Sequence, residues 1–561
     1  MTFNERIRQL MLIFSNEKVI GVLKRAIFIL GITAISLIFC WISLKQPRRT
    51  FLTDDHAFFS FARSIVNGTW FGYQFNLPKG PLYPLFIAAA HVMNIPLFFL
   101  QRVLYLFACL VLTYSVAPFT KNRFGSFILF AFLALCPVIT TTSVFNTAIR
   151  EAVNISLSLL IVASLVGVYV GYRDGVRKLG WLVILGISSA GFTLNREDYY
   201  WMLPAMSAIG ILILAAAKRR GSMKSLALLL IPLMIIVLAN LWIARINYLK
   251  YGIYVVTDMT SRDFVSVWSS AHRVKDSSPR RYVTISKESR EKLAAVSPSF
   301  KKLEPFIDGP SKALWIKEGC KSVGVCDDFV DGWFIWSFRS AMAGAGYLRS
   351  GAIAHDFYRE LAFEIDSACD SGKLTCNKKG RSLLAGWQNS YSPLVYREFF
   401  VVAVKFVNPQ SYIGTNLGVV NDPQKISAFE NFILEKVQYV ERDAWAIRVI
   451  KTGVVWYMMV IKILCGFALF SFFVRAYLAF RYRVGVAEIM IFIGVMSSVL
   501  TFLVLLAVID VTSYMASNSG RYLALVLPLF VFGIVFEVIT FLRLVLPRIL
   551  SLYANYTRTR A

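Results

Sequence analysis

Two adjacent aspartates, Asp54 and Asp55, follow the first long apolar run of the chain and open an amphipathic segment. Thr53 is a suitable helix N-cap, and the helix dipole favours acids in a first turn, so the pair could have a purely structural role. A carboxylate pair is also a common source of a general base. His56 adjoins the pair and could join a metal site, although a single histidine beside an aspartate is more often only a hydrogen-bond partner.

Basic residues near the ends of other apolar runs are candidates for binding a phosphate. Lys79 lies in a rigid Pro/Gly-rich stretch, and Arg196 begins a charged triplet that an interfacial belt would also explain. Arg521 precedes the last apolar run. Glu151 could face the same cavity, or it could simply pair with Arg150. Further supporting candidates are Glu197, Asp198 and Tyr522.

The elements that must position these residues are apolar runs. Of the 561 residues, 57% are hydrophobic, and about 20 apolar residues suffice to cross a bilayer. We expect an all-α polytopic membrane protein with about ten transmembrane helices and additional juxtamembrane helices. The expected spans are 26–44, 98–119, 125–145, 152–171, 179–195, 199–217, 225–244, 453–474, 487–509 and 522–542. The proline-punctuated segment 81–96 is expected to be half-embedded, because counting it as an eleventh span would put a basic loop outside.

The net charge of +27 comes from basic clusters between the apolar runs, such as Arg475, Arg481 and Arg483. This pattern is typical of cytoplasmic loops rather than of nucleic-acid binding. It predicts a cytoplasmic N-terminus (1–25) and tail (543–561), with Lys45, Arg48 and Arg49 as the exception on the outer side. The predicted outer regions are the loop 45–97 and a soluble domain, 245–452. The flanking membrane parts are 26–244 and 453–542.

The outer domain should be mixed but mainly helical, with a long helix near 337–371 that ends at Gly372. Its cysteines form two close pairs, and the other four cysteines lie in apolar runs. Two short disulfides in an oxidising compartment are the preferred interpretation, and four free thiols are the alternative. A zinc site is not favoured, because His355 lacks a matching partner. The paired cysteines are Cys320 with Cys326 and Cys369 with Cys376.

The order of these motifs resembles the GT-C fold glycosyltransferases that use lipid-linked sugars, in the branch of protein O-mannosyltransferases and aminoarabinose transferases. The similar features are the acidic pair, the Lys-Gly-Pro-Leu-Tyr stretch from Lys79, and the late Arg-Tyr-Leu…Pro segment from Arg521. The resemblance covers 26–244 and, weakly, the last span. That branch has Asp-Glu where this chain has Asp54-Asp55.

This resemblance implies that Asp54 is the general base and that Asp55 is a helper or a metal-side ligand. It also implies that Lys79, Arg196 and Arg521 bind the phosphate of a polyprenyl-phosphate-linked sugar. The expected acceptor is a glycan, glycolipid or protein outside the cytoplasmic membrane, with 245–452 binding it or covering the site. A divalent metal cofactor stays open.

Two other functions are alternatives to this interpretation. A transporter or flippase of lipid-linked glycan tends to have internal repeats and ionisable residues near mid-membrane. Here Glu537 lies inside an expected span, near its cytoplasmic end, and no repeat is evident. A glycan polymerase or ligase would not need the early acidic pair. The sequence therefore favours the glycosyltransferase.

Overall fold

The structure is a computed structural model. It describes residues 17–45, 53–176, 178–221, 223–309, 312–378, 387–413, 422–436 and 444–560. Among these residues every regular element is a helix, and strand-like pairing is limited to two isolated bridges. The predicted all-α fold class is confirmed. Most of the expected cytoplasmic N-terminus, 1–16, and the exceptional basic residues Arg48 and Arg49 lie outside the described residues.

In the described part of the chain, nine segments are long and apolar enough to cross a membrane, so the protein is a multi-pass membrane protein. These segments are Arg25–Lys45, Leu97–Thr120, Arg123–Thr140, Glu151–Asp174, Tyr199–Arg219, Leu226–Tyr251, Trp445–Tyr482, Val486–Thr512 and Gly520–Val545. The main helices that form them are α2 (Glu17–Lys45), α5 (Leu97–Thr120), α6 (Arg123–Ala134), α8 (Glu151–Asp174), α10 (Leu203–Arg219), α11 (Leu230–Tyr251), α20 (Ala444–Tyr482), α21 (Val486–Thr512) and α23 (Leu527–Arg560).

Two expected spans differ from the prediction. The span at 179–195 is α9 (Leu179–Asn195), whose 17 residues give a length of about 25 Å, short of a full hydrocarbon core. The expected helix 125–145 is broken after α6 into η1 (Pro137–Thr140) and α7 (Thr142–Phe145). Pro137 explains the break, because proline has no N–H to continue the helix. The half-embedded segment contains the short helix α4 (Leu82–Val92).

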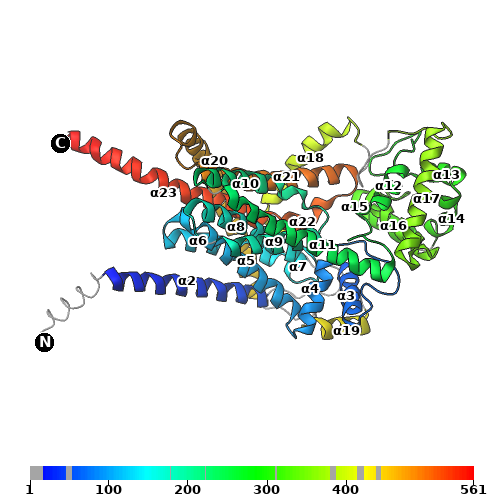
Figure 1. Ribbon diagram of the computed structural model, residues 1–561, viewed down its shortest axis with the longest axis horizontal. Coiled ribbons are helices and arrows are strands. Elements are labelled where there is room, and N and C mark those ends of the chain that lie inside the picture. Colours follow the sequence, from blue (N-terminus) through cyan, green and yellow to red (C-terminus); the bar gives the residue numbers. More distant parts are fainter. Residues whose placement is uncertain are drawn as a thin grey trace.

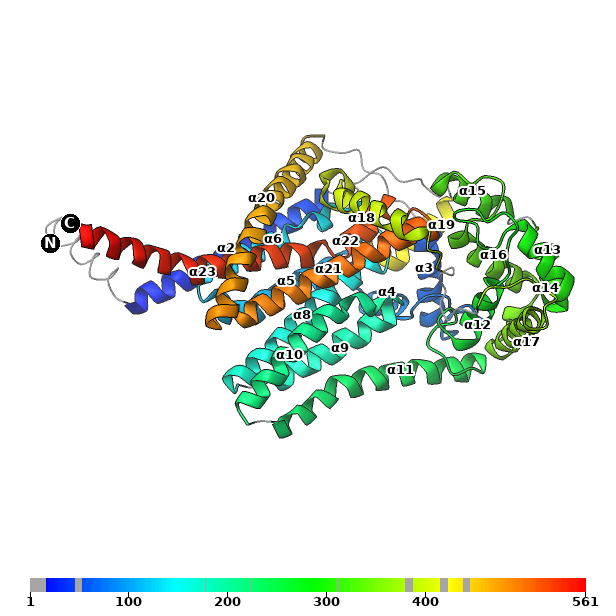
Figure 2. The ribbon, with the colours of Figure 1, turned by 90° about the horizontal axis from the view of Figure 1, so that it is seen from above.

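The helical bundle has α8 at its centre. The span of α8 is almost entirely buried, whereas those of α2 and α11 are mostly exposed, as expected for helices that face lipid. Figures 1 and 2 show the start of α2 and the end of α23 at one end of the molecule and the outer domain at the opposite end. The bundle therefore separates these helix ends from the outer domain.

The outer domain begins and ends at helices that run past the expected boundaries of 245 and 452. Helix α11 continues to Tyr251, and α20 starts at Ala444. The domain has its own hydrophobic core, formed mainly by α12, α14, α16 and α17. Its helices are α12 (Arg262–Ala271), α13 (Lys287–Val296), α14 (Pro298–Ile307), α15 (Lys312–Val323), α16 (Asp331–Gly344), α17 (Gly351–Asp370), α18 (Tyr391–Val407) and α19 (Pro423–Ile433).

The single long helix expected near 337–371 is wrong. The region forms α16 and α17, separated by Gly346 with φ +80° and the short turn η4 (Tyr347–Arg349). Left-handed backbone favours glycine and ends a helix. The Ser350 hydroxyl accepts a hydrogen bond from the Ile353 N–H and so caps α17. Gly372, with φ +74°, follows the end of α17 as predicted.

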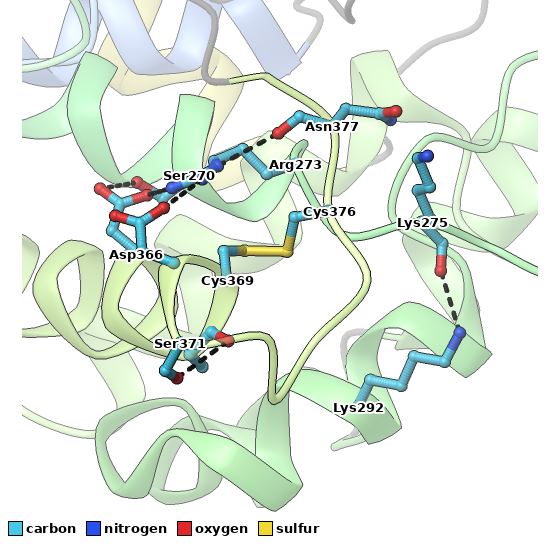
Figure 3. The surroundings of a disulfide bond; sticks show 11 residues. Ser270, Arg273, Lys275, Lys292, Asp366, Cys369, Ser371, Cys376 and Asn377 are labelled. Atoms are coloured by element: carbon cyan, nitrogen blue, oxygen red, sulfur yellow. Dashed lines mark hydrogen bonds and ion pairs between the residues drawn. A yellow bond between two sulfur atoms is a disulfide. The ribbon is translucent and has the colours of Figure 1, made fainter.

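Both predicted disulfides are present. Cys320 bonds to Cys326 in the α15 region, and Cys369 at the end of α17 bonds to Cys376. Figure 3 shows Arg273 beside the second disulfide, where its guanidinium donates to Asp366 at 2.6 Å. The chain around Cys376 pairs with the segment after α12, so the disulfide fixes the end of α17 to that segment. Disulfides indicate that this domain lies in an oxidising compartment.

One basic residue that was expected in a cytoplasmic cluster is buried instead. Arg475 is 1% exposed within α20 and donates to Glu537 of α23 at 2.8 Å. The Ser471 hydroxyl donates to the Glu537 carboxylate, and the Thr540 hydroxyl accepts a hydrogen bond from Arg475. We call Arg475 and Glu537 the inner ion pair.

Candidate functional site

Asp54 lies in the first turn of α3 (Thr53–Val66), and each of its carboxylate oxygens contacts a cation. Lys79 Nζ donates to Oδ1 at 3.0 Å, and Arg521 Nη1 donates to Oδ2 at 2.9 Å. Arg521 belongs to α22 (Gly520–Ala524), far along the chain. The fold thus brings together one predicted acid and two predicted phosphate-binding cations.

These two cations determine the ionisation of Asp54. Desolvation alone would raise the pKa of its carboxyl, but the charges and hydrogen bonds of Lys79 and Arg521 outweigh it and hold the pKa well below its usual range. The Asp54 side chain is 36% exposed, so a ligand can reach it. In this state Asp54 is a weak base, because its negative charge is already shared by two cations.

Lys79 is held by aromatic rings as well as by Asp54. Its Nζ lies 5.0 Å from the ring centre of Phe58 and 5.5 Å from that of Trp336. The next residue, Gly80, allows this loop to approach the end of α9, because a Cβ there would overlap the carbonyl oxygen of Leu194. The two rings and Asp54 therefore orient the ammonium group of Lys79.

Arg196 is held by two acids. Its Nη1 donates to Glu151 Oε1 at 2.8 Å, and Nε and Nη2 form a bidentate pair with Asp198 at 2.8 and 2.6 Å. Burial would raise the pKa of Asp198, but Arg196 outweighs it and lowers that pKa. The guanidinium carbons of Arg196 and Arg521 lie 5.8 and 4.8 Å from the ring centre of Tyr522. We call this group the outer charge cluster, formed by Asp54, Lys79, Glu151, Arg196, Asp198, Arg521 and Tyr522.

The pairing of Glu151 with Arg150 is wrong. Arg150 instead donates to both carboxylate oxygens of Glu197 at 3.0 Å, and Glu197 accepts the Gly80 N–H at 3.1 Å. Glu197 therefore connects the start of α8 to the loop that carries Lys79. Its role is to position that loop next to the outer charge cluster.

Asp55 is buried, 2% exposed, on the inner face of α3. It lies close enough to Tyr83 that its charge, together with burial and the charge of Glu151, raises the pKa of the Tyr83 hydroxyl well above its ordinary value. The Tyr83 hydroxyl donates to Gln101 at 2.7 Å. Asp55 thus sits beneath Asp54, where it contributes negative charge but is shielded from ligands.

His56 does not join the acids. Its side chain is exposed and lines a separate cavity, to which neither aspartate contributes. In the described part of the chain, no group of three or more histidine, cysteine, aspartate or glutamate residues could hold a metal ion. His355, considered for zinc, instead contacts Asp263 at 3.0 Å and Asp258 at 3.4 Å.

The outer domain supplies part of the site that the sequence did not predict. Helix α16 carries Trp336, which faces Lys79, and Gly332, where a Cβ would clash with the Tyr514 ring. On the same helix, Arg339 donates to Asn76 Oδ1 at 3.2 Å and pairs with buried Asp258. Helix α16 therefore contacts the cluster at Lys79 and holds the loop just before Lys79.

Two buried polar atoms of the cluster have no hydrogen-bond partner among the described residues. They are Nε of Arg521 and Oε2 of Glu151. The Arg521 side chain as a whole is 25% exposed, whereas its Nε atom is buried. Besides the contact with Asp54, its Nη2 donates to the Tyr522 hydroxyl at 3.0 Å. The part of Arg521 that a ligand can reach is therefore the exposed part of its side chain and not Nε.

No family model, curated protein or solved structure matches this chain.

Proposed function

We propose that the protein is a GT-C-type glycosyltransferase, which moves a sugar from a polyprenyl-phosphate donor to a glycan, glycolipid or protein acceptor. The proposed setting is the extracytoplasmic face of the cytoplasmic membrane. The resemblance of the motif order supports this proposal, and so do the disulfides of the outer domain, which favour an oxidising compartment.

One observation carries the proposal: the Asp54 carboxylate bridges Lys79 and Arg521 in a cluster that solvent can reach. A phosphate presents the same kind of oxygens to the same donors, and arginine and lysine both bind it through charge-assisted hydrogen bonds. A donor phosphate therefore fits the position that Asp54 now occupies at these cations.

Displacement of Asp54 from the two cations by the phosphate would also make Asp54 a stronger base. When the phosphate takes over Lys79 and Arg521, Asp54 loses the charges that depress its pKa, and its carboxylate becomes more basic. The acceptor hydroxyl oxygen then attacks the anomeric carbon while its proton passes to Asp54. The bond between that carbon and the phosphate oxygen breaks, and the polyprenyl phosphate leaves with the electron pair, stabilised by the two cations.

The other cluster residues fit supporting roles in this reaction. Arg196 already forms ion pairs with Glu151 and Asp198. It therefore contributes positive charge near the phosphate rather than a direct hydrogen bond to it. Helix α16 would cover the site, because Trp336 lies against Lys79. Excluding water would protect the donor from hydrolysis and strengthen the electrostatic contacts.

The test is transfer of label in membranes that contain the protein. Polyprenyl-phosphate-linked glucose, mannose and galactose, each radiolabelled in the sugar, serve as donors, and loss of label from the lipid fraction to a glycan or protein fraction is measured. We expect Asp54→Asn to lower turnover by about 10²–10⁴-fold, as for loss of a general base. Asp356→Asn, an exposed aspartate on α17, is the matched control and should keep full activity.

Two results would overturn the proposal. One is an Asp54→Asn protein that inserts normally and transfers as fast as wild type. The other is purified protein that moves the lipid-linked sugar across liposomes without forming a glycosidic bond, which would identify a transporter.

A further inference from the structure

A second cavity lies on the side of α3 that bears His56. It has a volume of 520 Å³ and is enclosed by α3, the loop after it and the first turns of α19. Figure 1 shows α19 beside α3. Small-molecule sites commonly have volumes of about 300–1,000 Å³. The cavity is therefore large enough for a small ligand, and nothing in the proposed transfer step uses it.

Most of the residues that line this cavity are polar or basic, and Phe59 and Ala428 add apolar surface. His56, Arg63 and Lys425 contribute positive or ionisable nitrogen groups, and the remaining lining includes hydroxyl and amide side chains such as Ser60 and Asn67. Among the described residues no aspartate or glutamate lines it. The composition therefore favours a ligand that carries negative charge and many hydroxyl groups.

The cations of the cavity are incompletely neutralised. Arg63 is exposed, and within the described residues its guanidinium makes no hydrogen bond or ion pair. Lys425 is paired at 3.0 Å with Asp422, the N-cap residue of α19. Burial and the charge of Lys425 lower the pKa of His56, and both residues line the cavity. An incoming anion would relieve this repulsion.

The lining of the cavity also includes an aromatic ring, that of Tyr73. Tyr73 lines the cavity and is 90% exposed, an unusual position for a large aromatic side chain. Binding sites for small polar ligands combine aromatic surfaces with a few directed polar groups. The Tyr73 ring offers such a surface beside the basic groups.

We propose that this cavity binds an anionic saccharide. The Tyr73 ring packs against a sugar face, the hydroxyl and amide side chains bind sugar hydroxyls, and Arg63 with Lys425 binds a carboxylate or phosphate substituent. Its use as an acceptor subsite rests on the proposed glycosyltransferase function, because His56 in its lining is only two residues from Asp54. Binding of the saccharide does not depend on that function.

Calorimetric titration of the full-length protein in detergent micelles tests the proposal directly. Trigalacturonate is the anionic probe, and maltotriose is the uncharged comparison. We expect trigalacturonate to bind about tenfold or more tightly, the effect of one charge-assisted contact. Arg63→Glu should remove this preference, while Lys301→Glu, the same charge change at an exposed lysine of α14, should leave it intact. Tyr73→Ala should weaken binding of both probes.

Each other outcome contradicts the proposal. Equal affinity for the two probes would exclude anion recognition, and unchanged binding in Arg63→Glu would exclude this cavity as the site. If the protein bound vesicles containing phosphatidylglycerol in an Arg63-dependent way but bound no saccharide, the cavity would be a lipid-headgroup site. A thermal unfolding curve of Arg63→Glu that matches wild type shows that the variant is folded. If Arg63→Glu lost saccharide binding but kept Asp54-dependent transfer, the cavity would not be an acceptor subsite, although it would still bind saccharide.

Discussion

The outer charge cluster and the inner ion pair are two ways of keeping charges within a mostly apolar bundle. In the inner pair, Arg475 and Glu537 are 1% and 0% exposed. In the outer cluster, Asp54 is 36%, Lys79 18% and Arg521 25% exposed. Both regions contain arginine nitrogens without a hydrogen-bond partner among the described residues. An unused buried donor is therefore not enough to identify a binding site, and access from solvent is the property that distinguishes the two.

The comparison also separates two uses of ion pairs. The inner pair joins α20 to α23, where desolvated charges must neutralise each other. The outer cluster joins α3, α22 and the loop before α4, and its charges are partly exposed to solvent, as the proposed exchange with a ligand requires. We therefore expect substitutions in the first region to change stability and those in the second to change activity.

The largest expected effect is on stability, from Glu537→Gln. The substitution leaves Arg475 buried without a counter-charge, which should cost about 3–5 kcal/mol. Thermal unfolding in micelles measures the loss, and transfer activity per folded molecule should be unchanged. Glu318→Gln, which removes an exposed pair with Lys321, is the control and should cost less than about 1 kcal/mol. A stable Glu537→Gln protein without activity would give the inner pair a functional role.

The next largest effect should come from Arg521→Ala. In the proposed reaction it removes a donor to the leaving phosphate, so transfer should fall by about 10²–10³-fold. Arg521→Lys should restore part of this loss, because lysine supplies the charge but not the planar fork. Arg359→Ala, an exposed arginine with its own ion pairs, should keep full activity. Equal activity of the Arg521 and Arg359 variants would remove Arg521 from the reaction.

A smaller effect is expected from Trp336→Leu on α16. Loss of the ring beside Lys79 should reduce transfer by about 2–30-fold, the size of a cation–π contact of roughly 0.5–2 kcal/mol. The measurement is the initial rate over a range of donor concentrations. Trp315→Leu, a tryptophan on α15 of the same domain, provides the control. If both substitutions had equal effects, α16 would have no specific role at the site.

The smallest expected effect is a pH dependence of stability. Because the folded-state pKa of Asp54 is depressed, its ion pairs stabilise the protein above the ordinary aspartate pKa of about 4 and lose this contribution as pH falls toward the folded value. The Tm difference between wild type and Asp54→Asn should thus shrink in acid. Solvent screening keeps it small, since the side chain is more than one-third exposed. A difference that grew as the pH fell would contradict the ion pairing.

Much of the fold could be predicted because its signals are local. Apolar runs of sufficient length gave most spans, and close cysteine spacing gave both disulfides. Helix ends were harder to predict where packing extends a helix, as in α20, or where a residue such as Pro137 interrupts a helix. For this reason the observed boundaries of the outer domain differ from the predicted ones.

The site was only partly predictable. Its acids and cations stood out as charges at the ends of apolar runs, but their partners depend on side-chain direction, so Glu151 pairs with Arg196 rather than with Arg150. Helical spacing could have separated His56 from Asp54, because residues two apart on a helix point to different faces. Trp336 lies in another domain, and no local pattern connects it to Lys79.

In the proposed reaction, a donor phosphate replaces the Asp54 carboxylate at Lys79 and Arg521. The most direct measurement is the affinity of purified protein for undecaprenyl phosphate, determined by native mass spectrometry for wild type, Asp54→Asn and Arg521→Ala. We predict that Arg521→Ala binds about tenfold or more weakly, whereas Asp54→Asn binds as tightly as wild type or tighter, because the competing charge is gone. Weaker binding by Asp54→Asn, or unchanged binding by Arg521→Ala, would contradict this claim.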